Sequence, residues 1–237
     1  MEKNLPPTEV IILAKTDILA ENILHIKWLD GESDGVRADF SGLYLKGETF
    51  NVWANTNFQK GFFIRSNLEC TDFRGVNLKG AYFTGSNLGR ADFKGANLQD
   101  ADFEGANLFG ADLRNVDLDG VAVHTNTIGY FLACPSEGAF TAFKKVRNYI
   151  VVLEVPADAK RSSATTYKCR CDKAKVLRIE NLDGTPADVY SVASGFDKDF
   201  FYTIGETVKV DDFDDDRWND CSTGIHFFID RAMAVLY

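Results

Sequence analysis

A large apolar residue returns every five positions through the middle of this chain, and this spacing restricts the possible folds more than any other feature. The side chain two positions before each such centre is usually small, the residue directly before it is often Asn or Asp, and the residue two positions after it is often Gly. The unbroken run of centres is Trp53, Phe58, Phe63, Leu68, Phe73, Leu78, Phe83, Leu88, Phe93, Leu98, Phe103, Leu108, Leu113 and Leu118.

A period of five fits neither an α-helix nor a flat strand. A helix, with about 3.6 residues per turn, would spread the centres over all its faces, and a strand would place successive centres on opposite faces. The spacing suits a chain that turns a corner every five residues, with the centre and the small residue facing inward. Gly and Asn/Asp tolerate the backbone geometry of such corners.

The repeat resembles the pentapeptide-repeat family, whose pattern is A-(D/N)-(L/F)-x-x. Residues 91–100, ADFKGANLQD, fit this pattern at every defined position. The resemblance implies a right-handed quadrilateral β-helix with four repeats per coil, so residues 20 apart stack. On that geometry Phe63 stacks on Phe83 and Phe83 on Phe103.

The repeat has an irregular start. Phe40, Leu45 and Phe50 extend the series of centres, but Phe50 and Trp53 are three residues apart instead of five. Residues 16–29 predict a short amphipathic helix. We expect it to cap the N-terminal edge of the β-helix, because an exposed β edge invites aggregation.

A second domain follows the repeat, because the register fades after Leu118 and the composition changes near residue 130. We predict a cap over 1–37, a β-helix over 38–125 and a small α+β domain over 130–237, which makes the chain mainly β. Asp230 is expected to N-cap a final helix over 231–236. A hairpin is expected around Gly205. The predicted strands cover 149–155, 167–171, 174–179, 200–204, 207–210 and 224–229.

This second half resembles a domain of unknown function that follows pentapeptide repeats in bacteriophage and other viral proteins. The resemblance implies a viral origin and brings no activity with it. The segments that carry it are 157–164, 168–174, 211–218 and 221–228.

Charge and cysteine content restrict the partners. The formal net charge of −9 disfavours direct binding of nucleic acid. No apolar run reaches about 18 residues and no signal peptide is evident, so no membrane partner is expected. Five scattered cysteines then predict reduced thiols in a cytoplasm, that of the host if the protein is viral.

Cations and hydroxyls gather in the second half and predict a binding site for an anion such as a phosphate, or for an acidic partner. Lys168 and Arg170 share one face of their strand if it is regular. A plain polar turn at 161–163 and a buried, hydrogen-bonded His226 are the alternatives. The predicted ligand-binding residues are Arg161, Ser162, Ser163, Lys168, Arg170, Arg217 and His226.

Metal sites and catalytic motifs find little support. Cys169 and Cys171, with Cys221, Cys134 and His226, form a candidate zinc set, but the spacing is not Cys-x-x-Cys, and buried free thiols are the alternative. The acidic run 211–216 fails the EF-hand pattern, because Arg217 and Thr223 stand where Gly and Glu are required. No Ser-His-Asp order, Walker loop or dinucleotide fingerprint occurs. We therefore predict no metal, no cofactor and no catalytic residue.

The leading hypothesis is a non-enzymatic phage accessory protein. It would bind a host protein or a small phosphorylated ligand through its second domain and interfere with host physiology or defence. One alternative is a DNA mimic acting on gyrase, as some pentapeptide-repeat proteins are. Residues 53–120, however, hold nine acids and seven interspersed bases, for a net charge of −2. The other alternative is an enzyme acting on a nucleotide, and the oligomeric state stays open.

Overall fold

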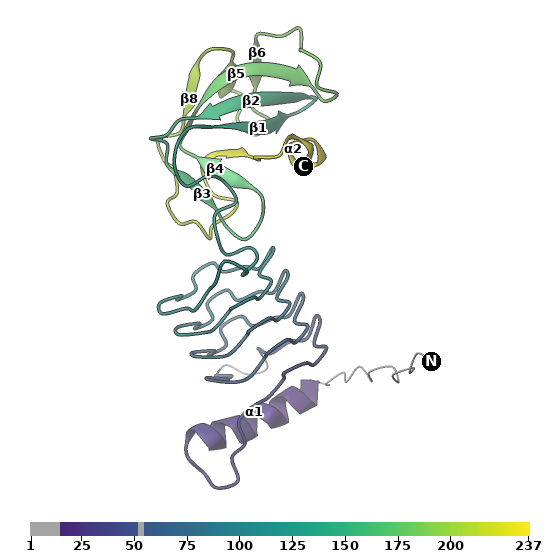
Figure 1. Ribbon diagram of the computed structural model, residues 1–237, viewed down its shortest axis with the longest axis vertical. Coiled ribbons are helices and arrows are strands. Elements are labelled where there is room, and N and C mark those ends of the chain that lie inside the picture. The colour runs from purple at the N-terminus through teal and green to yellow at the C-terminus, as the bar shows by residue number, and fades with distance from the viewer. Residues whose placement is uncertain (1–14, 52–54) are drawn as a thin grey trace, which may run out of the picture. The chain divides into compact units, whose positions relative to one another are not determined.

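The computed structural model describes residues 15–51 and 55–237, and the described chain is mainly β with a small helical content. It divides into two compact units, Met1–Tyr130 and Phe131–Tyr237, shown in Figure 1. Trp53, the first predicted centre of the unbroken run, lies outside the described residues.

Residues 20 apart pair in the first unit, as predicted. Parallel bridges join Asn67 to Asn87 and Asn87 to Asn107, and the coils lie one above another in Figure 1. The Phe63 and Phe83 rings stack with their centroids 4.8 Å apart, and Phe83 and Phe103 stack at 5.1 Å. The centres from Phe58 to Leu108 are fully buried, so the inward orientation is confirmed.

The first coil carries three additional residues. Asp39 pairs with Phe62 and Thr49 with Asp72, an offset of 23 residues instead of 20. Phe40 nevertheless stacks on Phe63, with ring centroids 5.1 Å apart. The irregularity predicted after Phe50 is therefore absorbed without loss of the interior stack.

Corner residues behave as predicted for glycine and for Asn and Asp. In the described coils the residue two after a centre has positive φ, which Gly95 adopts at 71°, Asp100 at 58° and Asn115 at 57°. Asn and Asp before the centre instead act through their side chains. Asp92 Oδ1 accepts the Lys94 N–H at 3.0 Å and Asn97 Oδ1 accepts the Gln99 N–H at 3.1 Å. They brace the corner by a hydrogen bond to the backbone.

The predicted N-terminal helix is present as α1, Lys15–Leu29, and it packs on the first unit's own coils. Its buried face carries Ile18 together with the polar Asn22 and His25, whereas Ile23 and Ile26 stay exposed. The amphipathic pattern expected for it is therefore wrong in detail. Asn22 and His25 both form hydrogen bonds to the coils, and the protection of the β edge by α1 stays a prediction.

His25 joins α1 to the chain that follows it. Its Nε2 donates to Gln59 O at 2.8 Å, and its Nδ1 accepts the Ala38 N–H at 3.0 Å. Asn22 adds a hydrogen bond from Nδ2 to Asn57 O at 2.7 Å. Only the neutral imidazole can accept at Nδ1, so this geometry requires an uncharged ring.

We expect the stability of the first unit to fall as the pH drops below the ordinary histidine pKa of 6.5. Burial, partly offset by the bond to Gln59 and reinforced by Arg37, lowers the pKa of His25. The unfolded chain then binds the proton more readily than the folded chain. The contribution of neutral His25 to the free energy of unfolding is therefore complete above pH 6.5 and is lost as the pH falls towards the folded-state pKa. Urea unfolding at pH 7.5 and 5.5 measures it.

The control for this expectation is His25→Leu, which removes the titrating group. This substitution leaves the Ala38 N–H without its acceptor and lowers the free energy of unfolding by about 1–3 kcal/mol at pH 7.5. Its stability is expected to depend less on pH than that of the parent. Because the pKa of His226 is lowered as well, the comparison is repeated in a His226→Asn background. An equal pH dependence with and without His25 would contradict the assignment.

The second unit consists of short antiparallel sheets. The strand orders are β1-β2-β5-β8, β3-β4-β9 and β6-β7. A core of apolar side chains and buried thiols includes Val151, Leu153, Cys169, Cys171 and Phe227. The strands are β1 Phe140–Val146, β2 Tyr149–Val155, β3 Arg161–Ser163, β4 Cys169–Cys171, β5 Lys173–Asn181, β6 Ser191–Ala193, β7 Phe201–Thr203, β8 Thr207–Lys209 and β9 Ile225–Phe227.

The final helix is confirmed and the predicted hairpin is wrong. Helix α2, Arg231–Leu236, begins at an Asp230 N-cap whose Oδ1 accepts the Ala232 N–H at 2.6 Å. β7 pairs with β6, and β8 pairs with β5. The Gly205 turn bonds to β5 itself, since the Gly205 N–H donates to Val176 O at 2.8 Å. The turn therefore directs the chain onto β5 and away from β7.

Candidate functional site

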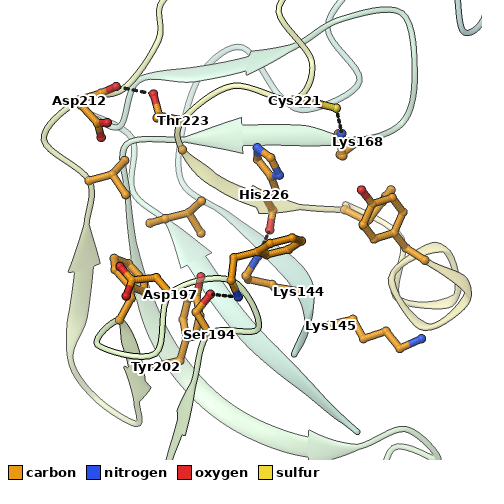
Figure 2. Close-up of a pocket in the computed structure, with 17 residues that line it drawn as sticks. Lys144, Lys145, Lys168, Ser194, Asp197, Tyr202, Asp212, Cys221, Thr223 and His226 are labelled. Carbon is orange, nitrogen blue, oxygen red and sulfur yellow. Dashed lines mark hydrogen bonds between the residues drawn. The ribbon is translucent and has the colours of Figure 1, made fainter. Parts of the chain in front are cut away.

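A cavity of about 530 Å³ opens in the second unit (Figure 2). This volume lies in the range typical of small-molecule sites, roughly 300–1,000 Å³. Its wall combines cations, rings and two carboxylates, and Figure 2 shows Asp197 and Asp212 on the side away from Lys168 and Lys145. The charged and aromatic lining residues are Lys144, Lys145, Lys168, His226, Phe196, Phe200, Tyr202, Phe228, Tyr237, Asp197 and Asp212.

Lys144 enters the cavity from the core face of β1. Strand side chains alternate, so Lys144 shares its face with Ala142 and Val146, both buried. Its Nζ donates to His226 O at 3.1 Å and lies 5.7 Å from the centre of the Tyr202 ring. Burial lowers the pKa of Lys144 to about 8.

The other two lysines are engaged more firmly. Lys168 is 6% exposed, and its Nζ lies 2.9 Å from Asp220 Oδ2 and 3.4 Å from Cys221 Sγ. Burial alone would lower the pKa of Lys168, but the hydrogen bond and charge of Asp220 raise it. Lys145 donates to Val235 O at 2.9 Å, in the last turn of α2. The Lys168 ammonium therefore keeps its positive charge at neutral pH.

His226 reports the electrostatic potential inside the cavity. Its Nε2 donates to Ser222 O at 2.9 Å. Burial lowers the pKa of His226, the bond to Ser222 opposes this, and the cations Lys144, Lys168 and Arg170 lower it further. The ring is therefore neutral at pH 7, and three cations lie near it.

The structure brings two of the seven predicted ligand-binding residues, Lys168 and His226, to the cavity wall. Cross-strand pairing aligns Ser162, Arg170 and His226 in one row of the β3-β4-β9 sheet. Ser162 and Ser163 are buried in β3, so the alternative of a plain polar turn at 161–163 is wrong. The ligand-binding role of these residues stays a prediction.

Arg161 does not converge with Lys168 and Arg170. It pairs across strands with Cys171, and neighbouring residues of a strand point to opposite faces, so it leaves the Ser162–Arg170 row. Its guanidinium holds the surrounding chain together. It donates to the carbonyl oxygens of Pro135, Gly138, Pro156, Ala157 and Ala159.

Arg170 and Arg217 also bind backbone carbonyls. Arg170 is 1% exposed and donates to the carbonyl oxygens of Asp214, Asp216 and Thr223 at 2.7–3.0 Å. Arg217 donates to Ser163 O at 3.1 Å. The acidic run is thus held through its backbone oxygens by a buried cation, and its loop supplies Asp212 and Thr223 to the cavity wall.

The candidate zinc and calcium sets are not assembled. Within residues 15–51 and 55–237, no three His, Cys, Asp or Glu side chains lie close enough to hold a metal ion. Cys134, Cys169 and Cys171 are buried and, like the other two cysteines, free. This arrangement fits the alternative of buried free thiols.

Sequence reasoning missed Lys144 and Lys145 because it did not predict β1. A signal was present in the chain. Val146 pairs with Tyr149 across the two-residue turn Arg147-Asn148, so β1 and β2 form a hairpin. Two apolar runs separated by two residues, one of them Asn, are typical of such a turn. The alternation of Ala142, Lys144 and Val146 then predicts a lysine on the core face.

No helix in the described part of the chain is long and apolar enough to cross a membrane.

Comparison with known families finds both halves of the chain. Pentapeptide repeats match residues 54–85 and 86–121, and a family of unknown function, DUF5758, matches residues 130–234. A search of curated proteins finds no match.

Solved pentapeptide-repeat structures are similar to part of the chain. Rfr23 from the cyanobacterium Cyanothece 51142 is 29% identical over 38% of this chain and 60% of its own, with a TM-score of 0.29. AT2G44920 from the Arabidopsis thaliana thylakoid lumen is 31% identical over 38% and 53%, with a TM-score of 0.23. QnrB1, a plasmid-mediated fluoroquinolone resistance protein, is 21% identical over 38% and 79%, with a TM-score of 0.19.

The chain thus spans 60% and 53% of the first two structures that it matches. Taken with the coils and the second unit described above, the matches identify pentapeptide repeats followed by a DUF5758 domain.

Proposed function

We propose that the second unit binds a small phosphorylated molecule with an aromatic body, and that the repeat unit is a rigid scaffold. The observation that carries this proposal is the cavity, which is lined by three lysines and by the aromatic rings of five Phe and Tyr residues. A phosphate accepts charge-assisted hydrogen bonds from lysine, and a planar body packs against the rings.

The charge distribution supports an anion over a cation. Burial is the main cause of the lowered pKa of His226, and the charges of Lys144, Lys168 and Arg170 lower it further. Lys168 pairs with Asp220, whereas Lys144 makes no ion pair within the described residues, so its charge is available to a ligand. An anion placed beside it gains a cation that the protein itself leaves uncompensated.

The test is calorimetric titration of the full chain with adenosine 5′-monophosphate and with adenosine. We expect the phosphate form to bind more tightly, and Lys144→Met to weaken it about tenfold or more, because a charge-assisted hydrogen bond is lost. Lys94→Met, on an exposed corner of the repeat unit, is the matched control. Equal binding of nucleoside and nucleotide would overturn the proposal.

For the biological setting we retain the phage accessory role implied by the sequence resemblance, in which ligand or host-protein binding interferes with host defence. A pull-down from host lysate tests it, with Lys144→Met as the comparison. If the parent chain recovers a partner and the variant does not, the partner binds through the cavity and the accessory role depends on it.

A DNA mimic acting on gyrase is the second candidate, and the charges of the repeat unit argue against it. A mimic requires a continuous negative face, whereas these acids sit beside bases. Arg74 lies 2.7 Å from Asp72 and 3.6 Å from Asp92, and Lys79 lies 3.7 Å from Asp100. Such pairing leaves little long-range negative field.

We therefore expect no inhibition of gyrase supercoiling at micromolar concentrations of the full chain. A supercoiling assay at two salt concentrations measures this. Inhibition that fades as salt is added would favour the mimic instead, because screening weakens an electrostatic imitation of DNA.

A further inference from the structure

We infer that the Lys144 amine captures a carbonyl compound, an aldehyde or ketone with an anionic aromatic body, as a covalent imine. This inference rests on the cavity being a ligand site, as proposed above, and adds a reaction to it.

The first support is position. Lys144 projects from a sheet face whose other members on β1, Ala142 and Val146, are buried and apolar, and Val151 opposite it is fully buried. The amine nonetheless opens onto the cavity and makes one hydrogen bond, to His226 O. Figure 2 shows it beneath His226. Burial destabilises the charged form of a lysine in this position, and its amine faces a space that a small molecule can enter.

The second support is that the ionisable groups around Lys144 leave its charge uncompensated. Burial raises the pKa of the Cys171 thiol to about 12 and raises that of the Tyr202 phenol, and it lowers the pKa of His226. All three are uncharged at pH 7.5. Within the described residues no carboxylate pairs with Lys144, and the two carboxylates of the wall, Asp197 and Asp212, lie on the side away from Lys168 and Lys145.

Together these surroundings favour the free amine, the form that is nucleophilic. With its pKa at about 8, Lys144 holds on the order of a hundredfold more free amine at pH 7.5 than an ordinary lysine.

The reaction balances without an oxidant or a metal. The nitrogen lone pair of Lys144 attacks the carbonyl carbon, the carbonyl π pair moves to oxygen, and the oxygen takes up the proton that the attacking nitrogen releases. The resulting carbinolamine loses water as the nitrogen releases its proton, which leaves a C=N bond between ligand and lysine. Lys145, Lys168 and the rings of the wall would hold the anionic aromatic body while this bond forms.

The experiment uses the full chain and three matched probes. Pyridoxal 5′-phosphate carries ring, phosphate and aldehyde, pyridoxal lacks the phosphate, and pyridoxine 5′-phosphate lacks the aldehyde. After reduction with borohydride, peptide mass mapping locates the adducts. We expect pyridoxal 5′-phosphate to label Lys144 about tenfold or more faster than the exposed Lys94 at pH 7.5. We also expect pyridoxine 5′-phosphate to slow this labelling.

Each outcome decides something different. Labelling of Lys144 no faster than Lys94 overturns the inference, whatever the result with adenosine 5′-monophosphate. Equal labelling by pyridoxal and by its phosphate supports carbonyl capture and counts against phosphate recognition. Lys144→Arg keeps the cation and is expected to abolish the adduct at this position without creating a faster one elsewhere. If that variant fails to fold, mapping of the parent chain still decides the question.

Discussion

Phe93→Ala is expected to reduce the free energy of unfolding of the repeat unit by about 3–5 kcal/mol. Phe93 is fully buried, and its ring stacks on Phe73 with centroids 5.0 Å apart and an interplanar angle of 5°. Truncation leaves a cavity in the middle of the stack, which the hydrogen-bonded coils on either side cannot close. Such a loss is a large part of a typical stability of about 5–15 kcal/mol.

Thermal melts followed by circular dichroism measure this loss. Phe109→Ala is the control, because Phe109 lies in a turn of the coil and is only partly buried. Its truncation is expected to cost about 1 kcal/mol or less. A Phe93→Ala protein that melts with the parent would show that the stacking register is wrong.

Arg170→Met is expected to destabilise the second unit by about 3 kcal/mol or more. The change leaves the carbonyl oxygens of Asp214, Asp216 and Thr223 without their buried donor, and each unsatisfied group costs about 1–3 kcal/mol. The guanidinium also lies 5.3 Å from the Phe213 ring centre. Since Thr223 lines the cavity, the variant is also expected to bind adenosine 5′-monophosphate more weakly.

Urea unfolding of the full chain, with a probe in the second unit, measures the effect. Arg178→Met is the control, since the Arg178 side chain is 57% exposed and its buried partner Glu180 keeps the ion pair with Arg231 at 2.9 Å. Removal of a mostly exposed member of an ion pair is expected to cost about 1 kcal/mol or less. Similar losses in the two variants would refute the view that Arg170 fastens the acidic loop.

The period of five, together with the four repeats per coil that the family resemblance implies, predicted the interior of the repeat unit down to individual ring pairs, because each centre has the same neighbours in every coil. Phe63 on Phe83 follows from the two together. The hydrogen bonds of His25 were not predictable, because they join a helix to residues 13 and 34 positions away. No local pattern encodes such contacts.

The site was harder to predict for a related reason. Sequence reasoning selected Arg161, Arg170 and Arg217 because guanidinium groups bind anions, and in the fold these groups bind carbonyl oxygens of loops. A sequence pattern does not show which backbone oxygens will accept these bonds, since every residue carries one. His226 reaches the cavity from β9, where it pairs with Arg170, and Lys168 reaches it from the residue directly before β4.

The parallel bridges between coils have a consequence for how the repeat unit breaks. Each coil bonds only to the coils directly before and after it, so coupling along the stack is between nearest neighbours. Opening is then expected to start at terminal coils and to advance one layer at a time, with the slowest amide exchange near Leu78 and Phe83. A protease acting on this unit would shorten it from an end and leave a folded, trimmed remainder.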